Sequence, residues 1–182
     1  MDKPFIIVSG LPGSGKSTLA QLLAPALGLP LIDKDTILER LFESKGTGDS
    51  AWRRALSRES DEILRKEATA SNGAVLVSHW RLPGMQPDSG TPTDWLPEIS
   101  DRIVNVRCVC DAGIAARRFI QRRRHPGHGD DAASETEVVA SIRAVAQLGP
   151  LEIGQLVELD TSRTPNPDGV IDDIRKALSL PG

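Results

Sequence analysis

The sequence predicts an α/β fold in which helices cover a parallel sheet. Short apolar runs that are typical of buried strands alternate along the 182 residues with longer segments of helical periodicity. Directly after the first apolar run comes a glycine-rich stretch, Gly10-Leu11-Pro12-Gly13-Ser14-Gly15-Lys16-Ser17. Polar and charged residues follow the later runs, at the edge of the sheet where such folds bind ligands. These three observations place a ligand site beside the glycine-rich stretch.

The composition is that of one globular domain of ordinary size, and we expect the whole chain, residues 1–182, to form it. Its net charge of -3 and pI near 5.6 argue against a general nucleic-acid-binding protein. No apolar run approaches the roughly 20 residues that span a bilayer, and the glycine-rich stretch begins too early for a signal peptide to precede it. We therefore expect a cytoplasmic protein with no membrane partner. Cys108 and Cys110 alternate on a predicted strand and are expected to be reduced core residues.

The glycine-rich stretch matches G-x-x-x-x-G-K-[ST], the pattern of a phosphate-binding loop. A predicted strand over 5–8 precedes it, and a predicted helix that ends near Leu27 follows it. Glycine lets backbone N–H groups approach phosphate oxygens, and the helix directs its positive end at the same anion. We expect Lys16 to reach the β- and γ-phosphates and the Ser17 hydroxyl to bind Mg²⁺. The predicted nucleotide-binding residues are Gly10, Leu11, Pro12, Gly13, Ser14, Gly15, Lys16, Ser17 and Thr18.

Two aspartates follow the second predicted strand, residues 29–32. In an open parallel sheet ligands bind beyond the carboxyl ends of the strands, so Asp33 and Asp35 should face the bound phosphates. We predict that Asp35 is the base that orients and deprotonates an acceptor hydroxyl, with Asp33 as the second choice. The alternative is that Asp35 only caps the helix predicted over 36–41.

Two arginines near the start of the next long helix, predicted over 51–71, are candidates for contact with the acceptor. A polar, glycine-containing connection is predicted before this helix, over 42–50. Arg53 and Arg54 are close in sequence to the segments that we expect at the ligand crevice. Most arginines on helices, however, belong to a solvated surface. We therefore expect them either to contact substrate or to face the solvent.

The buried strand predicted over 74–78 ends directly before three further candidates for acceptor binding, His79, Trp80 and Arg81. An arginine at this place suits a bidentate contact with an anionic or polyhydroxyl acceptor. Trp80 is expected to lie either in the substrate region or in the core. The proline-rich segment that follows cannot form a long helix, and we predict that residues 79–100 cover the substrate.

A basic lid is predicted at about residues 112–132, after the strand predicted over 103–109. Arg118 and Arg122 would lie one turn apart on one face of its helix and neutralise the transferring phosphoryl group. His125 and His128 have H-x-x-H spacing, but no cysteine or acidic cluster accompanies them at the ligand spacing of zinc. The remaining predicted elements are a helix over 134–148 with a capping box, a strand over 155–159 and a helix over 167–180.

With these motifs in this order, the chain resembles the small P-loop kinases of the AAA-type group, among them gluconate, shikimate, chloramphenicol and polynucleotide 5′-hydroxyl kinases and zeta-toxin-like proteins. The resemblance implies the three-layer P-loop NTPase sandwich, with five parallel strands in the order 2-3-1-4-5 and an arginine-rich helical lid. It also implies ATP and Mg²⁺ as cofactors. In those families an aspartate just beyond strand 2 is the usual base, a position that Asp35 matches, and the lid pattern R-x-x-x-R matches Arg118 and Arg122. We therefore expect an ATP-dependent kinase whose acceptor is a hydroxyl of a small molecule.

The chain departs from the family pattern at two positions. Ser78 stands where many relatives end strand 3 with an aspartate, so the hold on Mg²⁺ must come from Asp33, Asp35 or water. Pro126 replaces the phenylalanine that follows R-x-x-x-R-x-x-H in gluconate kinases, which argues against gluconate. A GTPase is disfavoured because the N-K-x-D and D-x-x-G patterns are absent from the sequence. The alternative function is a nucleotide-binding regulatory module, or an ATPase without a small-molecule acceptor.

Overall fold

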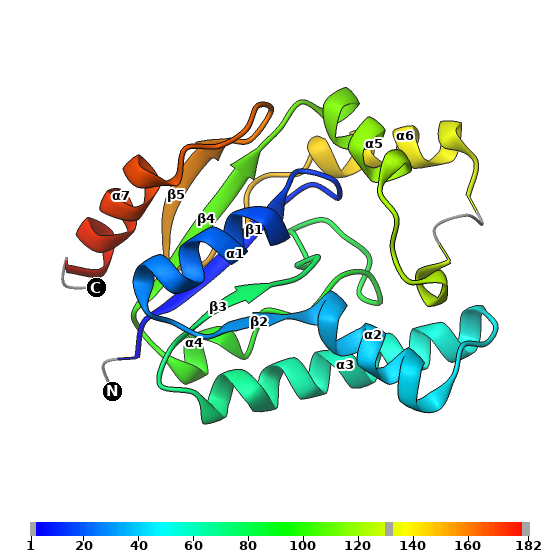
Figure 1. Cartoon of the computed structure of the whole chain (residues 1–182), viewed down its shortest axis with the longest axis horizontal. Coiled ribbons are helices and arrows are strands. Elements are labelled where there is room, and N and C mark those ends of the chain that lie inside the picture. Colours follow the sequence, from blue (N-terminus) through cyan, green and yellow to red (C-terminus); the bar gives the residue numbers. More distant parts are fainter. Residues whose placement is uncertain (1–2, 130–132, 180–182) are drawn as a thin grey trace.

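The computed structural model describes residues 3–129 and 133–179. Five parallel strands form one sheet in the order β2-β3-β1-β4-β5, as predicted (Figure 1). The strands are β1 (Phe5–Gly10), β2 (Leu31–Asp33), β3 (Ala74–Val77), β4 (Ile103–Val109) and β5 (Gln155–Asp160). The helices are α1 (Lys16–Leu27), α2 (Lys34–Lys45), α3 (Ser50–Ala70), α4 (Leu96–Ile99), α5 (Ala112–Gln121), the 3₁₀ turn η1 (Pro126–His128), α6 (Glu135–Ala146) and α7 (Pro167–Ser179).

The central strand β1 separates two apolar cores, because its side chains alternate between the faces of the sheet. Ile6 and Val8 belong to the core that α1 and α7 cover. Phe5 and Ile7 belong to the core on the other face, which α3 and α4 cover. All four side chains are fully buried, and burial of each stabilises the fold by about 1.5–3 kcal/mol. The sheet is therefore fixed between two layers of helices, as the three-layer prediction requires.

The strand register assembles the edge of the sheet at which the site was predicted. Val77 of β3 pairs with Val8 of β1 on one side and with Asp33 of β2 on the other. The residues that follow these strands therefore lie next to one another. The phosphate-binding loop, Ser78 and the start of α2 meet there although they are far apart in sequence.

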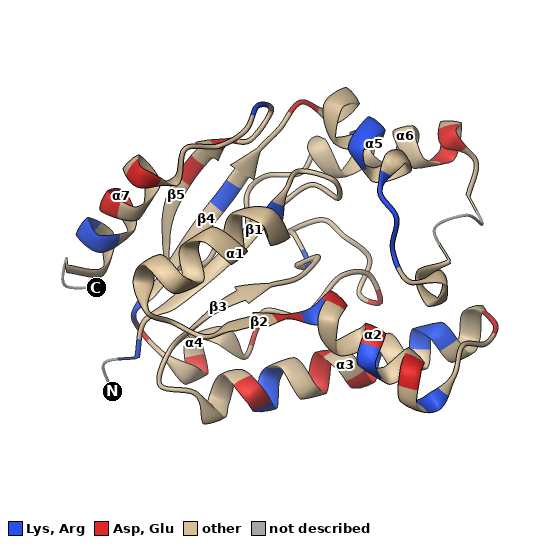
Figure 2. Cartoon of the chain, in the orientation of Figure 1, with Lys and Arg blue, Asp and Glu red and all other residues tan. Residues whose placement is uncertain are grey.

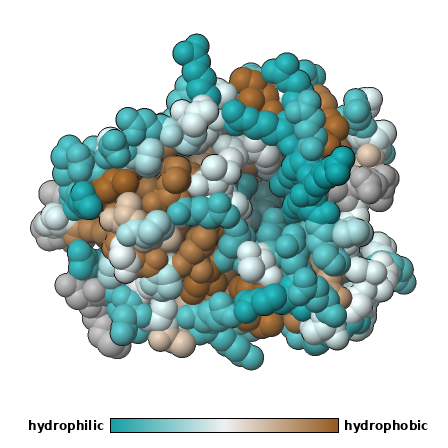
Figure 3. Space-filling model, viewed as in Figure 1, coloured by the Kyte–Doolittle hydropathy of each residue, from teal (hydrophilic) through white to brown (hydrophobic). Residues whose placement is uncertain are grey.

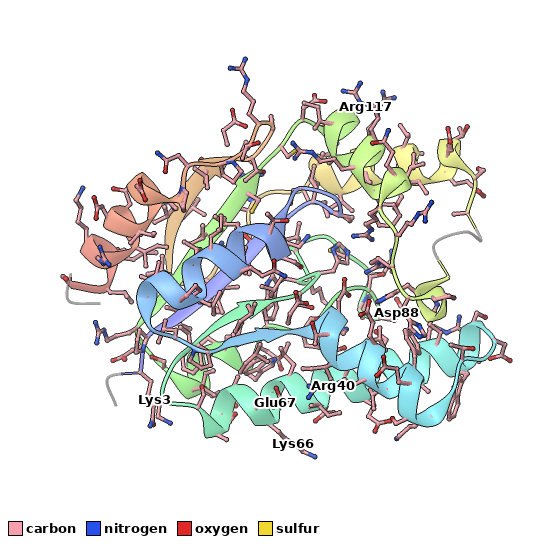
Figure 4. The ribbon with its side chains drawn as sticks, in the orientation of Figure 1. Lys3, Arg40, Lys66, Glu67, Asp88 and Arg117 are labelled. Carbon is pink, nitrogen blue, oxygen red and sulfur yellow. The ribbon has the colours of Figure 1, made fainter. Side chains whose placement is uncertain are left out.

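Two predicted element boundaries are wrong. The connection predicted over 42–50 is helical as far as Lys45, because Leu41 and Phe42 continue the apolar stripe of α2 and pack against Leu56 of α3. An exposed ion pair between Arg40 and Glu67 also joins these two helices (Figure 4). The first helix of the lid ends at Gln121, so the arginines at 122–124 follow it outside the helix, with Arg122 in extended backbone.

Other boundaries agree with the prediction. The capping box of α6 is present, with Ser134 and Glu137 bonded reciprocally. Gly28 ends α1 in the left-handed conformation expected of a C-terminal cap. The last three residues of the predicted lid, 130–132, and the predicted end of the last helix at residue 180 lie outside the described residues. Within residues 3–129 and 133–179, no helix has the length and apolar character needed to cross a bilayer.

Candidate active site

A cleft of about 530 Å³ opens at the carboxyl edge of the sheet. Figure 3 shows it as a hollow bordered mainly by hydrophilic residues. Its walls come from the phosphate-binding loop, the start of α2, the end of β3, one side of α3 and the segment after α5. Cationic side chains outnumber anionic ones in this lining, which suits a polyanionic ligand. The cationic set is Lys16, Lys34, Arg53, Arg122, Arg123 and Arg124, and the anionic set is Asp33 and Asp35.

The phosphate-binding loop requires its glycines. Gly13 has a φ of 79°, and a Cβ at this position would lie 2.1 Å from the carbonyl oxygen of Ala115 in α5. The loop therefore packs directly against the backbone of the first lid helix. Gly15, with a φ of 90°, stands at the N-cap of α1 without a side-chain cap among the described residues. The first N–H groups of α1 consequently point into the cleft, as an anion site requires.

Lys16 is held against the loop that precedes it. Its Nζ donates to the carbonyl oxygens of Gly10 (3.1 Å) and Leu11 (2.9 Å). The pKa of Lys16 is lowered to about 8, mainly by burial and also by the charge of Arg122, while Asp35 opposes the shift. A phosphate group beside Nζ favours the charged form, because an opposite charge raises the pKa of a lysine.

The predicted metal-binding pair is brought together. Ser17 Oγ donates to Asp33 Oδ2 at 2.8 Å, and Asp33 Oδ1 accepts from the backbone N–H of Asp35 at 2.9 Å. Burial raises the pKa of Asp33, and the bond from Ser17 opposes that rise. Hydroxyl and carboxylate oxygens are the ligands that Mg²⁺ prefers, so these two residues fit the ion.

The N-cap of α2 is Asp33, not Asp35, so the alternative role proposed for Asp35 is wrong. Asp35 lies in the first turn of α2 and lines the cleft. Its Oδ2 forms an ion pair with Arg124 Nη1 at 2.5 Å. Burial by itself would raise the pKa of Asp35, but the positive charge of Arg124, its hydrogen bond to Asp35 and the charges of His128 and Arg122 together outweigh burial and hold the pKa below its ordinary value. Asp35 is therefore an ionised carboxylate at neutral pH.

The arginines of the lid divide into two groups. Arg122, Arg123 and Arg124 line the cleft from the basic stretch that follows α5 (Figure 2). The guanidinium of Arg122 lies over the ring of Phe119, 3.9 Å from its centroid. Arg118 instead donates to the carbonyl oxygens of Thr161 (2.6 Å) and Ser162 (2.9 Å) after β5.

The predicted pairing of Arg118 and Arg122 on one helical face is therefore wrong. The helix ends between them, and Arg118 is directed toward the loop after β5. Arg118 does not line the cleft, whereas Arg122 does. Arg117 is exposed and projects from the outer side of α5 (Figure 4).

The segment after α5 crosses the molecule and rests on α2 and α3 (Figure 1). The ring of Phe42 stacks on His125, with centroids 5.4 Å apart, and meets His128 edge-on. His128 is buried, and its Nε2 lies 3.0 Å from Glu39 Oε1. Burial and the charge of Arg124 lower the pKa of His128. Arg53 completes the contact by donating from Nη1 to the carbonyl oxygen of His128 at 2.8 Å.

Not every predicted acceptor residue reaches the cleft. Asp33, Asp35, Arg53 and His79 line it. Trp80 does not, because it is buried and its Nε1 donates to the carbonyl oxygen of Val8 at 2.9 Å.

Arg54 and Arg81 line a neighbouring cavity of about 590 Å³ rather than the cleft itself. Arg81 Nε is bonded there to the carbonyl oxygen of Ser89 at 2.9 Å. Its guanidinium therefore holds the covering segment 79–100. Lys34, Ser57 and Gly90 line both cavities, so the two adjoin.

A polar network that the sequence did not reveal joins the two cavities. Ser78 Oγ lies 2.5 Å from Thr91 Oγ1, which donates to Asp61 Oδ1 at 2.7 Å. Lys34 Nζ forms an ion pair with Asp61 at 2.6 Å. The only signal was the place of Asp61, three residues before the buried Leu64 on α3. Thr91 gave no signal, because its contacts depend on how the covering segment folds back.

The sequence matches the profile of the AAA domain family over residues 5–148, which is more than half of the chain. The chain belongs to the AAA domain family. This AAA domain also matches curated shikimate kinases over short stretches. It is 38% identical over 73 residues to the enzyme of Corynebacterium glutamicum, which is 40% of this chain and 43% of that enzyme. It is 51% identical over 37 residues to the enzyme of Mycobacterium ulcerans, which is 20% of each chain. The AAA domain thus spans less than half the length of either enzyme.

Solved structures resemble this AAA domain over nearly its whole length. A presumed kinase from Chloroflexus aurantiacus is 25% identical with a TM-score of 0.81, and 97% of this chain and 99% of that chain are covered. A gluconokinase from Sinorhizobium meliloti is 16% identical with a TM-score of 0.59, covering 97% and 91% of the two chains. A shikimate kinase from Bacteroides thetaiotaomicron is 17% identical with a TM-score of 0.57, covering 97% and 99%. The last two show that the P-loop kinase fold is shared.

Proposed function

We propose that the protein is an ATP- and Mg²⁺-dependent kinase that transfers the γ-phosphoryl group to a hydroxyl of a small molecule. One observation carries the proposal: the ionised carboxylate of Asp35 and the phosphate-binding loop with Lys16 line the same cleft. A phosphoryl acceptor has to lie between a base and the γ-phosphate, in line with the bond that breaks. The names of the similar proteins, shikimate kinase and gluconokinase, support a small hydroxylated acceptor.

In this proposal each wall of the cleft has one task. The loop N–H groups and Lys16 bind the β- and γ-phosphates, and Arg122 and Arg123 neutralise the phosphoryl group as it moves. Asp35 accepts the proton of the acceptor hydroxyl as its oxygen bonds to phosphorus. Mg²⁺, held by Ser17 with Asp33 behind it, would neutralise charge on the phosphate oxygens.

The test is the rate of ADP formation by wild type and Asp35→Asn with a panel of acceptors that includes gluconate, shikimate and neutral sugars. We expect wild-type ADP formation to depend on one acceptor and on Mg²⁺. Asn keeps the size of the side chain and removes its basicity, so turnover should fall about 10²- to 10⁴-fold while the unfolding midpoint stays unchanged.

Asp33→Asn serves as the matched control. Asn caps a helix as well as Asp and can still bond Ser17, so the Asp33 variant should keep its stability and lose activity through the missing negative charge beside Mg²⁺. Full activity of Asp35→Asn together with an inactive but stable Asp33→Asn would make Asp33 the base. If the wild type forms ADP at the same rate with and without every acceptor, the protein is better described as an ATPase. If it forms no ADP at all, it is better described as a nucleotide-binding module.

A further inference from the structure

The contact between Arg124 and Asp35 joins the lid to the proposed base. Arg124 Nη1 lies 2.5 Å from Asp35 Oδ2, although the two residues are 89 positions apart in sequence. A carboxylate oxygen that already accepts a charge-assisted hydrogen bond from a guanidinium is less accessible to a second donor. The lid residue therefore occupies one of the two oxygens of the group that has to take the acceptor proton.

The position of Arg124 is fixed by contacts with α2 and α3. His125 stacks on Phe42, and His128 meets Glu39, both on α2. Arg53 of α3 donates to the backbone of His128. None of these three contacts involves the phosphate-binding loop. The guanidinium is thus held over Asp35 by the acceptor side of the cleft.

We propose that Arg124 is a specificity-determining residue that occupies Oδ2 of Asp35 until an acceptor enters, and so keeps this oxygen from activating water. This inference rests on the proposed function, because it takes Asp35 as the base. Asp35 could take a proton either from a bound alcohol or from water, and Arg124 determines which of these two nucleophiles it activates.

The side reaction that Arg124 suppresses is ordinary ATP hydrolysis. A water oxygen bonds to the γ-phosphorus, the bond from that phosphorus to the bridging oxygen of ADP breaks, and the water proton passes to Asp35. ADP and inorganic phosphate result. With an acceptor alcohol the same bonds form and break, and the phosphorylated alcohol replaces inorganic phosphate.

An acceptor can displace Arg124, whereas water cannot. A polar acceptor binds to the cleft through several groups, and this binding offsets the loss of one ion pair. A water molecule makes too few contacts to do the same. The side chain of Asp35 is 46% exposed and that of Arg124 19%, so solvent partly screens the ion pair and lowers the cost of separating it.

The experiment measures inorganic phosphate released from MgATP without any acceptor. Arg124→Gln removes the charge and should raise this rate about tenfold, a fraction of what a general base contributes. Arg124→Lys keeps a positive charge and should stay near the wild-type rate. Arg117→Gln removes a charge from the exposed outer side of α5 and is the matched control. In the double variant Asp35→Asn with Arg124→Gln, the rise should disappear.

Each outcome decides the inference. An unchanged or lower hydrolysis rate in Arg124→Gln overturns it, and so does a rise that persists in the double variant. An equal rise in Arg124→Lys would assign the effect to the shape of the lid and would also overturn it. If the wild type transfers phosphoryl groups to no acceptor, the proposed function fails, while the hydrolysis rates still decide whether Arg124 restrains Asp35.

Discussion

In the loop wall of the cleft, the side-chain bonds of Lys16 join near neighbours in sequence, whereas the side-chain bonds of the lid wall join distant residues. Lys16 bonds carbonyl oxygens that lie five and six positions before it. Arg124 and Asp35 are 89 positions apart, and Arg53 and His128 are 75 apart. Short loops close at a small entropic cost, and long ones at a larger cost.

The two walls also differ in the strength of their contacts. The loop packs against the α5 backbone so closely that only glycine fits at residue 13. On the lid wall Asp35 is 46% exposed, and an ion pair of so exposed a carboxylate contributes about 0–1 kcal/mol. The contact of Glu39 with the buried His128 is a hydrogen bond rather than an ion pair at neutral pH, because the pKa of His128 is lowered. The loop and α5 are therefore the tighter part of the cleft wall, and we expect the segment after α5 to shift more readily when a ligand binds.

The largest effect in this comparison should come from the loop wall. Lys16→Ala removes a charged donor that strengthens its contact as the γ-phosphoryl group departs, so turnover should fall about 10²- to 10³-fold. Steady-state ADP formation measures this loss. Lys66→Ala, on the outer side of α3, is the control and should leave turnover unchanged (Figure 4). Full activity of the Lys16 variant would remove the basis for assigning the loop to phosphate binding.

A smaller and more selective effect is expected on the lid wall. Arg122→Ala should lower kcat on the order of 10²-fold, because one preorganised donor to the transferring phosphoryl group is lost. The dissociation constant for ATP, measured by titration calorimetry, should change much less. Equal losses in kcat and ATP affinity would mean that Arg122 only binds ground-state phosphate. Arg117→Ala should change neither quantity.

The smallest effect on turnover should come from a substitution where the lid packs against α2. A Cβ on Gly127 would lie 2.5 Å from the Phe42 ring, so Gly127→Ala should prevent the lid from resting as it does. Overpacking costs about 1–3 kcal/mol, and a partial shift of the ring relieves some of it, so turnover should fall by less than about tenfold. Gly169→Ala meets no atom within 4 Å and is the control. Because Phe42 is buried, the melting temperature should also fall by about 2–4 °C per kcal/mol of overpacking. Wild-type values of both turnover and melting temperature would contradict this packing of the lid on α2.

The sequence predicted the features that depend on local pattern. The strand at 103–109, the glycine stop of α1 and the cap of α6 follow from periodicity and capping chemistry, and the structure confirms them. The strand order came from the family resemblance and is also confirmed. The placement of Asp33 and Asp35 at the cleft followed from the position of strand ends in a parallel sheet.

Features that depend on tertiary contacts were not predictable in the same way. The alternation of residues after β3 could not show that Trp80 turns inward to the Val8 carbonyl while His79 faces the cleft. Nor could the spacing of Arg118 and Arg122 show that the helix ends between them. It also could not show that Arg118 donates a hydrogen bond to the carbonyl oxygen of Thr161. Each of these outcomes was decided by a partner that lies far away in sequence.

The carboxylate of Asp33 has one further consequence. One of its oxygens accepts from Ser17 beside the phosphate-binding loop, and the other accepts from the backbone that begins α2. A ligand that fixes either end of this carboxylate restricts the other end. Nucleotide and acceptor should therefore bind cooperatively, and each should change the affinity of the other by the same factor, since thermodynamic coupling between two sites is reciprocal.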